Sequence, residues 1–105
     1  MKRLILILAL LLITSCTTQA PTQSNPSEIN IRNFAFTPNE ITIKAGDTVT
    51  WINNDNAPHT VTSDEFNSGN LNPEQSFLHT FLEPGTYDYR CNFHSGMKGR
   101  IIVTS

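Results

Sequence analysis

Four side chains that can donate to a metal stand in a short pattern in the second half of the sequence. Cys91, His94 and Met97 follow one another with two residues between each pair, and a further imidazole, His59, lies upstream. The residues between His94 and Met97 are serine and glycine, which are poor helix formers, and a strand-like pattern runs directly into Cys91. The sequence therefore predicts a loop between two strands that turns these side chains toward one point.

This set of donors indicates copper rather than zinc or an oxygen-loving ion. Structural zinc sites use thiolates and imidazoles, and a thioether is a poor ligand for zinc. Calcium and magnesium need oxygen ligands, and no carboxylate belongs to the set. Two imidazoles, one thiolate and a weak axial thioether describe a trigonal blue-copper site, which accepts both Cu(I) and Cu(II). Such a site can take up and release one electron with little rearrangement of its ligands.

Each of these side chains also has a plainer interpretation when it is considered alone. Cys91 could be a small buried hydrophobic residue, Met97 could fill the core, and an isolated histidine more often makes a hydrogen bond than binds a metal. The spacing of the whole set favours the metal site. His79 shares a face with Phe77 and Phe81 and has no second ligand near it in the sequence, so we interpret it as structural.

The chain begins like an exported lipoprotein. A short positive start, Met1-Lys2-Arg3, precedes ten apolar residues, Leu4 to Ile13, which as a helix would cover about 15 Å, half of a bilayer core. The segment Ile13-Thr14-Ser15-Cys16 resembles the lipobox of bacterial lipoproteins. We expect residues 1–15 to be a signal peptide and Cys16 to be lipidated after cleavage. An ordinary secretory signal with an incidental cysteine is the alternative.

A linker is expected between the lipid anchor and a folded domain. Residues 16–27 contain two prolines, many threonines, glutamines and serines, and no large apolar residue, so they are typical of a flexible tether. The domain then covers residues 28–105, anchored to a membrane of the cell envelope on its extracytoplasmic side. If Cys16 is lipidated, Cys91 has no disulfide partner in an oxidising compartment, which indicates that it is buried or bound.

The charge of the domain argues against nucleic acid as a partner. Without Lys2 and Arg3, the chain carries five basic residues against nine acidic ones, a net charge of −4. Proteins that bind nucleic acid need a basic face to meet the phosphates.

Short alternating segments broken by turn residues predict an all-β domain, a sandwich or barrel of seven to eight strands. The alternating residues are Ile29 and Ile31, Ile41 and Ile43, Val49 and Trp51, Phe77, His79 and Phe81, Tyr87 and Tyr89, and Ile101 and Val103. We expect a bulge or bend near Arg32-Asn33, where the alternation changes parity, and a strand over His59-Thr60-Val61-Thr62. A core is expected around Trp51 together with Phe36, Phe81 and the tyrosines.

Several longer motifs accompany the ligand pattern. They are Phe34-Ala35-Phe36-Thr37-Pro38, Gly46-Asp47-Thr48-Val49-Thr50-Trp51, Asn53-Asn54-Asp55, Pro58-His59-Thr60-Val61, Pro84-Gly85-Thr86-Tyr87 and the segment from Cys91 to Met97. In this combination the stretch from Phe34 to Val103 resembles the cupredoxins, the type 1 blue copper proteins, and the short gaps around His94 are similar to the ligand loop of amicyanin. The resemblance implies a Greek-key β-sandwich with one copper ion near one end. It also implies that His59 and His94 bind through Nδ1.

Two departures from well-known cupredoxins affect the expected site. Many members have asparagine after the upstream histidine and serine or threonine after the cysteine, whereas Thr60 and Asn92 stand the other way round here. Our hypothesis is that these two side chains still hydrogen-bond across the two ligand loops. Plant plastocyanins carry an exposed tyrosine before the cysteine, where this chain has Arg90. That leaves the edge of His94 as the expected route for electrons.

The resemblance implies a carrier of single electrons between redox partners, not an enzyme. The expected partner is a redox protein such as a c-type cytochrome or a membrane oxidoreductase. The binuclear copper centre of oxidases needs two cysteines in its loop, and the loop has Cys91 alone. The alternative is periplasmic copper binding and delivery, which the small number of methionines makes less favoured. We expect docking through a small apolar ring around His94, formed by Ala57, Pro58, Phe93 and Met97.

Overall fold

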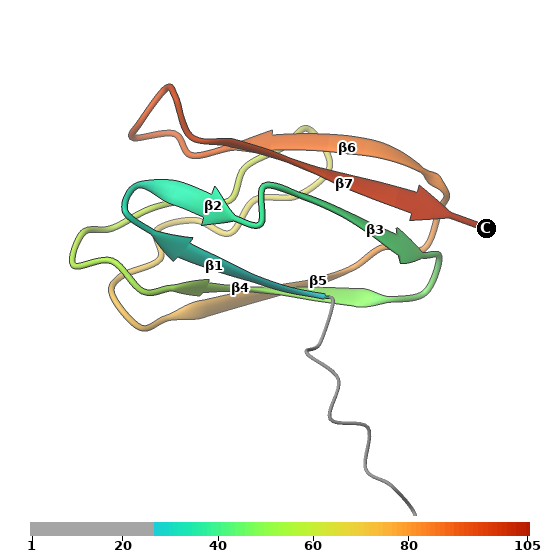
Figure 1. Ribbon diagram of the computed structural model, residues 1–105, viewed down its shortest axis with the longest axis horizontal. Helices are drawn as coiled ribbons and strands as arrows, with labels where there is room; N and C mark the ends of the chain where they lie inside the picture. Colours follow the sequence, from blue (N-terminus) through green and yellow to red (C-terminus); the bar gives the residue numbers. More distant parts are fainter. Residues whose placement is uncertain (1–26) are drawn as a thin grey trace, which may run out of the picture.

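Two β-sheets pack face to face in the computed structural model, which describes residues 27–105 (Figure 1). The strands are β1 (Glu28–Arg32), β2 (Ala35–Thr37), β3 (Glu40–Lys44), β4 (Thr48–Asn53), β5 (Ser76–Thr80), β6 (Gly85–Arg90) and β7 (Lys98–Thr104). One sheet has the order β2-β1-β4-β5 and the other the order β3-β7-β6. The predicted signal peptide, Cys16 and nearly all of the predicted linker lie outside the described residues.

The chain crosses from one sheet to the other three times, after β2, after β3 and after β5. These crossings make β1 parallel to β4 and β3 parallel to β7, whereas the remaining neighbours are antiparallel. The expected all-β sandwich of seven to eight strands is confirmed, with seven strands over residues 27–105. Across those same residues, no helix has the length and apolar character needed to cross a bilayer.

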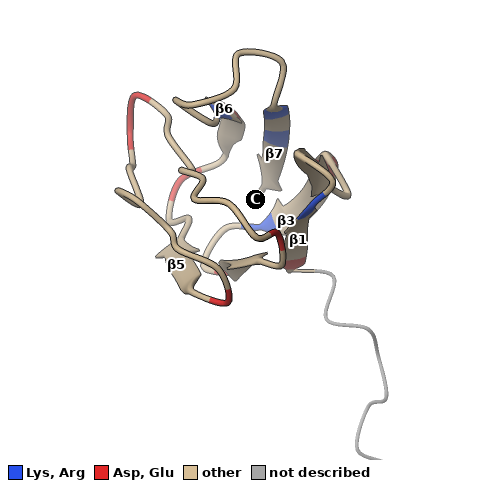
Figure 2. Cartoon of the chain, turned by 90° about the vertical axis from the view of Figure 1, so that its left-hand side faces the viewer, with Lys and Arg blue, Asp and Glu red and all other residues tan. Residues whose placement is uncertain are grey.

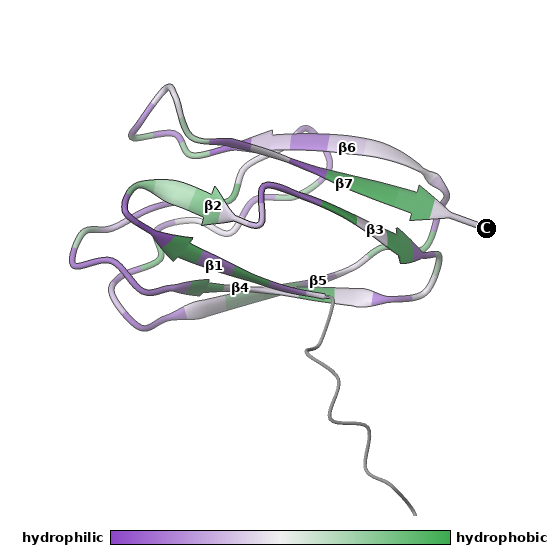
Figure 3. Cartoon of the chain, in the orientation of Figure 1, coloured by the Kyte–Doolittle hydropathy of each residue, from purple (hydrophilic) through white to green (hydrophobic). Residues whose placement is uncertain are grey.

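The core lies between the sheets, and the alternation along the strands explains it. Buried residues of β1, β3, β4 and β7 alternate with more exposed ones. Figure 3 shows hydrophobic residues along these strands. Trp51 is fully buried and packs with Phe66, Phe77, Phe81 and Tyr89. Truncating an aromatic residue in such a position typically costs about 3–5 kcal/mol, so this cluster supplies much of the stability of a small domain.

The expected bulge or bend near Arg32-Asn33 is instead a tight hairpin turn. Arg32 pairs with Ala35, and the two residues between them, Asn33 and Phe34, have φ angles of 53° and 56°. Two central residues with positive φ define a type I′ turn, whose twist suits an antiparallel hairpin. The turn reverses the chain between β1 and β2, which accounts for the change of parity in the sequence. Asparagine is common in this conformation and phenylalanine is not.

The expected strand over residues 59–62 is not a continuous strand. His59 exchanges two backbone hydrogen bonds with Leu71, of 3.0 and 2.8 Å, whereas Thr62 exchanges two bonds of 2.9 Å with Arg90 at the end of β6. The segment changes partners within three residues, so no regular ladder can form. The hydrogen bonds between Thr62 and Arg90 connect the segment after His59 to the strand that leads into Cys91.

The loop from Cys91 to Met97 joins β6 to β7, as the sequence predicted, and lies at one end of the sandwich (Figure 1). It is closed by two backbone hydrogen bonds, from Cys91 N–H to the Met97 carbonyl at 3.1 Å and from Met97 N–H to the His94 carbonyl at 3.0 Å. The two sulfur-bearing residues therefore sit where two paired strands begin to separate.

Candidate metal centre

His59 and Cys91 meet in the interior of the domain. The distance from Cys91 Sγ to His59 Nδ1 is 3.6 Å, and the two side chains are 1% and 0% exposed. Donors that share one metal ion bind it at about 2.0 to 2.3 Å, so they must themselves lie about 3 to 4 Å apart. The Sγ–Nδ1 pair has the separation and the chemistry of two ligands of one ion.

His94 and Met97 lie beside this pair. The imidazole rings of His94 and His59 have centroids 5.2 Å apart, and His94 is half-buried. Met97 is 3% exposed and belongs to the same buried cluster as Cys91. The structure thus brings the four sequence-predicted ligands to one end of the sandwich, with His94 nearest to solvent.

The predicted ligands do not form a cluster of histidine, cysteine and carboxylate side chains alone. Over residues 27–105, no three side chains of the His, Cys, Asp and Glu types are close enough together to hold an ion as they stand. The fourth predicted donor here is a thioether, which lies outside those types. His59, Cys91 and Met97 are buried, and His94 is the least buried of the four predicted ligands.

Hydrogen bonds around the sulfur join the two ligand segments. The backbone N–H of Thr60 points at Cys91 Sγ, 3.4 Å away, and the Thr60 hydroxyl accepts the backbone N–H of Asn92 at 2.8 Å. Thr60 Oγ1 also lies 2.9 Å from Thr62 Oγ1. The sequence hypothesis expected the Asn92 side chain in this contact. The donor is its backbone instead, so any residue except proline could supply it.

Asp55 sets the state of His59. Its Oδ2 lies 2.8 Å from His59 Nε2, and because a carboxylate can only accept, Nε2 carries a hydrogen. In the neutral imidazole Nδ1 then holds the lone pair, and it faces Cys91 Sγ at 3.6 Å. Burial alone would raise the pKa of Asp55, but hydrogen bonds from the Phe34 N–H, the His59 ring and the Asn33 N–H outweigh it and lower that pKa. The carboxylate therefore stays ionised beside the histidine.

The sequence reasoning missed Phe34 and Asp55 as parts of this site. The Phe34 ring meets the rings of His59 and His94 edge-on, with centroid distances of 5.3 and 4.8 Å, although it remains 51% exposed. Asp55 was visible within the Asn53-Asn54-Asp55 motif, four residues before His59. Nothing in the sequence indicated that its carboxylate would meet a turn more than 20 residues upstream.

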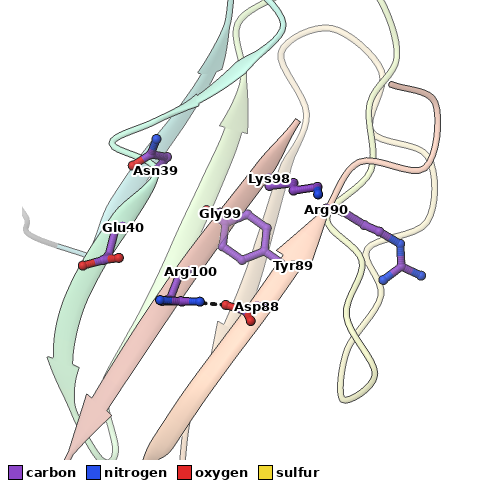
Figure 4. Close-up of a pocket in the computed structure, with 8 residues that line it drawn as sticks. All are labelled: Asn39, Glu40, Asp88, Tyr89, Arg90, Lys98, Gly99 and Arg100. Carbon is purple, nitrogen blue, oxygen red and sulfur yellow. Dashed lines mark hydrogen bonds and ion pairs between the residues drawn. The ribbon is translucent and has the colours of Figure 1, made fainter. Parts of the chain in front are cut away.

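A cavity of about 490 Å³ lies elsewhere, on the outer side of the β3-β7-β6 sheet (Figure 4). It is lined by Asn39, Glu40, Asp88, Tyr89, Arg90, Lys98, Gly99 and Arg100. None of the predicted metal ligands lines it, although Arg90 and Lys98 directly adjoin Cys91 and Met97 in the chain.

A two-sheet sandwich that gathers a cysteine, two histidines and a methionine at one end has the donor types of a metal-binding β-sandwich. The chain belongs to the cupredoxin family, because the family model described as Cupredoxin-like domain matches residues 3–103. Amicyanin of Paracoccus versutus is 37% identical over 82 residues, which are 71% of this chain and 62% of that protein. Plastocyanin of Scenedesmus fuscus is 43% identical over 85 residues, 67% of this chain and 87% of that protein.

Solved structures agree with the sequence comparison. A purple cupredoxin from Nitrosopumilus maritimus has a TM-score of 0.70 at 33% identity, covering 74% of this chain and 99% of the other. A Cu(I) amicyanin mutant has a TM-score of 0.69 at 35% identity, covering 72% of this chain and 79% of the other. The matches span 62% and 63% of the two Paracoccus amicyanins, so less than two thirds of those proteins has a counterpart here.

The predicted family and its cofactor are confirmed at this level. Cupredoxin homologues bind a single copper ion in a type 1 site, and the donors near His59 fit that ion by type and by the Sγ–Nδ1 separation.

Proposed function

We propose that this protein carries single electrons between redox partners in the cell envelope, with one copper ion bound by His59, Cys91, His94 and Met97. The observation that supports this best is the buried pair of His59 Nδ1 and Cys91 Sγ, 3.6 Å apart. Bound copper supplies a one-electron Cu(I)/Cu(II) couple, and this donor set accepts both states.

The residues of the chain hold the donors and exclude water. The N–H of Thr60 donates to Cys91 Sγ and stabilises negative charge on the thiolate, and Asp55 keeps His59 Nδ1 free to bind. His94 is the least buried of the four ligands, so the edge of its ring is the expected route for electrons. Ligands that the fold already holds need little movement, which is what a rapid electron carrier requires.

Copper delivery is the alternative function, and burial argues against it. A protein that hands Cu(I) to a partner needs exposed, exchangeable ligands, whereas His59, Cys91 and Met97 are each at most 3% exposed. The rate of electron self-exchange should be compared with the rate of copper transfer to a chelator. Fast exchange with slow transfer supports the electron carrier, and the reverse supports delivery.

We propose no catalytic activity for this domain. Its amicyanin and plastocyanin homologues are electron carriers, not enzymes. The partner we propose is a redox protein such as a c-type cytochrome or a membrane oxidoreductase, and redox encounters of this kind use small interfaces because they must dissociate quickly.

The docking ring proposed from the sequence needs one correction. Met97 is 3% exposed and cannot line a surface, whereas Phe34 and Phe93 are 51% and 48% exposed. We therefore propose that Phe34 and Phe93, with Ala57 and Pro58, form the apolar ring around His94.

Loading the purified domain with Cu(II) tests the proposed function. It should bind one copper and turn blue through thiolate-to-copper charge transfer, whereas Cys91→Ser should abolish the colour and leave a folded β domain. His79→Ala is the matched control. His79 lies on β5, where its ring packs against Phe66 with a centroid distance of 4.6 Å, so its loss should not affect copper loading. A wild-type protein that stays colourless with Cu(II) contradicts the proposal.

We also propose lipidation at Cys16 and attachment to the membrane. Full-length protein expressed with its leader should fractionate with membranes and carry a diacylglyceryl mass at Cys16. Cys16→Ser should release it into the soluble fraction, and equal membrane attachment of both proteins would exclude the lipid anchor.

A further inference from the structure

The turn between β1 and β2 holds an unfavourable backbone that something must offset. Asn33 and Phe34 have φ angles of 53° and 56°, and a bulky residue in the left-handed region is strained. In consecutive left-handed residues the N–H groups form a small concave site for an anion. Here the Asp55 carboxylate occupies it, with Asn33 N–H to Oδ1 at 2.7 Å and Phe34 N–H to Oδ2 at 2.9 Å.

The Asp55 carboxylate also accepts a hydrogen bond from His59, and Asn53 holds the segment that carries Asp55 in place. Oδ2 accepts the His59 Nε2–H at 2.8 Å, and the Asp55 side chain is 12% exposed. Asn53 is fully buried, accepts the Asp55 backbone N–H at 3.0 Å, and donates to the carbonyls of Ala57 and Leu71, each at 2.9 Å. Asp55 is therefore held from its own side before it binds the turn and the imidazole.

Holding the turn places the Phe34 ring against both imidazoles. The ring planes meet at 81° with His59 and at 78° with His94, the edge-on geometry that aromatic pairs prefer. Phe34 is the contact that joins the buried ligand to the half-buried one from outside the ligand loop.

We propose that Asp55 and the β1–β2 turn form a third loop of the copper centre. Asp55 is a positioning residue with two separable effects. It fixes His59 with its hydrogen on Nε2, and through the turn it holds Phe34 against His59 and His94. This inference rests on the copper site proposed above and extends it to residues outside the ligand loop.

The two effects predict different results for two substitutions. Asp55→Asn keeps the size of the side chain but removes a negative charge that favours Cu(II), so it should raise the reduction potential. Phe34→Leu keeps an apolar side chain but removes the edge contacts, so it should speed release of Cu(I) while shifting the potential less. Aromatic edge pairs are worth about 0.5–1.5 kcal/mol, which corresponds to roughly two- to tenfold faster release.

The test measures copper-free and copper-loaded protein separately. Nitrogen NMR of the copper-free domain should show His59 with its hydrogen on Nε2 in the wild type and a mixture of tautomers in Asp55→Asn. Reduction potential and the rate of Cu(I) transfer to bicinchoninate are then measured on loaded protein. Asp64→Asn and Leu82→Ala are the matched controls, since both residues are exposed and lie outside these contacts.

Asp55→Glu separates charge from geometry, because it keeps the carboxylate but lengthens the side chain. It should retain a potential close to that of the wild type and still release Cu(I) faster. Potentials, release rates and tautomers in Asp55→Asn and Phe34→Leu that match those of the controls would overturn the inference. A wild type that takes up no copper would instead reject the proposed function, and the NMR result on the copper-free domain would still decide the role of Asp55.

Discussion

Thr60 connects the two ligand segments more directly than any other residue described around Cys91. Its N–H points at Sγ and its hydroxyl accepts the Asn92 N–H at 2.8 Å. A hydrogen bond on a thiolate and a fixed distance between ligand segments both affect how strongly a metal is held. The side chain of Thr60, not that of Asn92, makes the connection.

Replacing Thr60 with valine should therefore loosen the site, whereas Asn92→Ala should change it little. Valine has the same shape but cannot accept the Asn92 N–H, which leaves a backbone donor without its partner at a cost of about 1–3 kcal/mol. We expect faster copper loss and a lower melting temperature for Thr60→Val. Chelator competition and thermal unfolding measure both, and an Asn92→Ala variant with the larger effect would show that the amide side chain matters after all.

Tyr89 is a second residue whose environment has a measurable consequence. Tyr89 is 2% exposed, and its hydroxyl has no hydrogen-bond partner. Burial raises the pKa of Tyr89 to about 12, and the nearby Trp51 indole acts in the opposite direction. In the unfolded chain the phenol loses its proton near pH 10, whereas the folded protein keeps it until about pH 12. The unfolded state thus binds fewer protons in this window, and stability falls as the pH rises.

The free energy of unfolding should drop by roughly 2–3 kcal/mol between pH 10 and pH 12 because of Tyr89 alone. Tyr89→Phe should remove this part of the pH dependence and leave that of the other groups. Denaturant unfolding of both proteins across this range measures the difference. Parallel curves for the two proteins would mean that the buried phenol does not titrate as described.

At the scale of elements, β6 and β7 fit together because Gly99 has no side chain. Tyr89 and Gly99 are paired across the two strands, and the Tyr89 ring lies over the glycine (Figure 4). A Cβ atom at Gly99 would overlap the ring and hydroxyl of Tyr89. Neither strand can shift to relieve the overlap without moving the ligand loop that joins them.

Gly99→Ala should consequently destabilise the domain by about 1–3 kcal/mol, the usual cost of overpacking. Gly96→Ala is the control, since a Cβ there meets nothing within 4 Å. Adding Tyr89→Leu to Gly99→Ala should recover part of the loss, because the two residues are in contact. Melting temperatures of the single and double variants test this, and additive effects would show that the steric explanation is wrong.

Strand positions were predictable because one face of each strand is buried. The alternation at Ile29, Ile41 and Tyr87 follows directly from period-two burial, and the core formed around Trp51 as expected. The segment 59–62 was not predictable, because its backbone partners, Leu71 and Arg90, belong to different parts of the fold. Local alternation indicates an extended chain but does not specify its partners.

The candidate site shows the same division between local and distant information. Three of the four proposed ligands fall within seven residues, so their spacing alone indicated the metal. Asp55 and Phe34 meet across 21 residues through a backbone N–H group, which every residue type except proline carries. Only the fold could place them at His59, and the ligand set itself stays a prediction until copper is measured.

For the molecule as a whole, charge is distributed unevenly. Residues 27–105 carry nine acidic and five basic side chains, yet three of the basic ones lie on the ends of β6 and β7 (Figure 2). Arg100 is bonded to Asp88 at 2.7 Å, and this pair lowers the pKa of Asp88. Arg90 and Lys98 are directly opposed across the strands, and within the described residues neither forms an ion pair. Like charges in such a position repel each other.

The Arg90 and Lys98 charges adjoin Cys91 and Met97, so they should influence which reagents reach the copper. Charges act over about 8–10 Å at ordinary salt, and local charge near a site changes encounter rates more than net charge does. The double variant Arg90→Gln, Lys98→Gln should react several-fold more slowly with hexacyanoferrate(III) at low ionic strength and faster with tris(phenanthroline)cobalt(III). Both differences should vanish at high salt.

Lys44→Gln is the control, because Lys44 ends β3 beside Thr104 at the other end of the sheet. Stopped-flow oxidation of the reduced protein gives the rates, and an equal effect of Lys44→Gln would show that net charge controls the encounter.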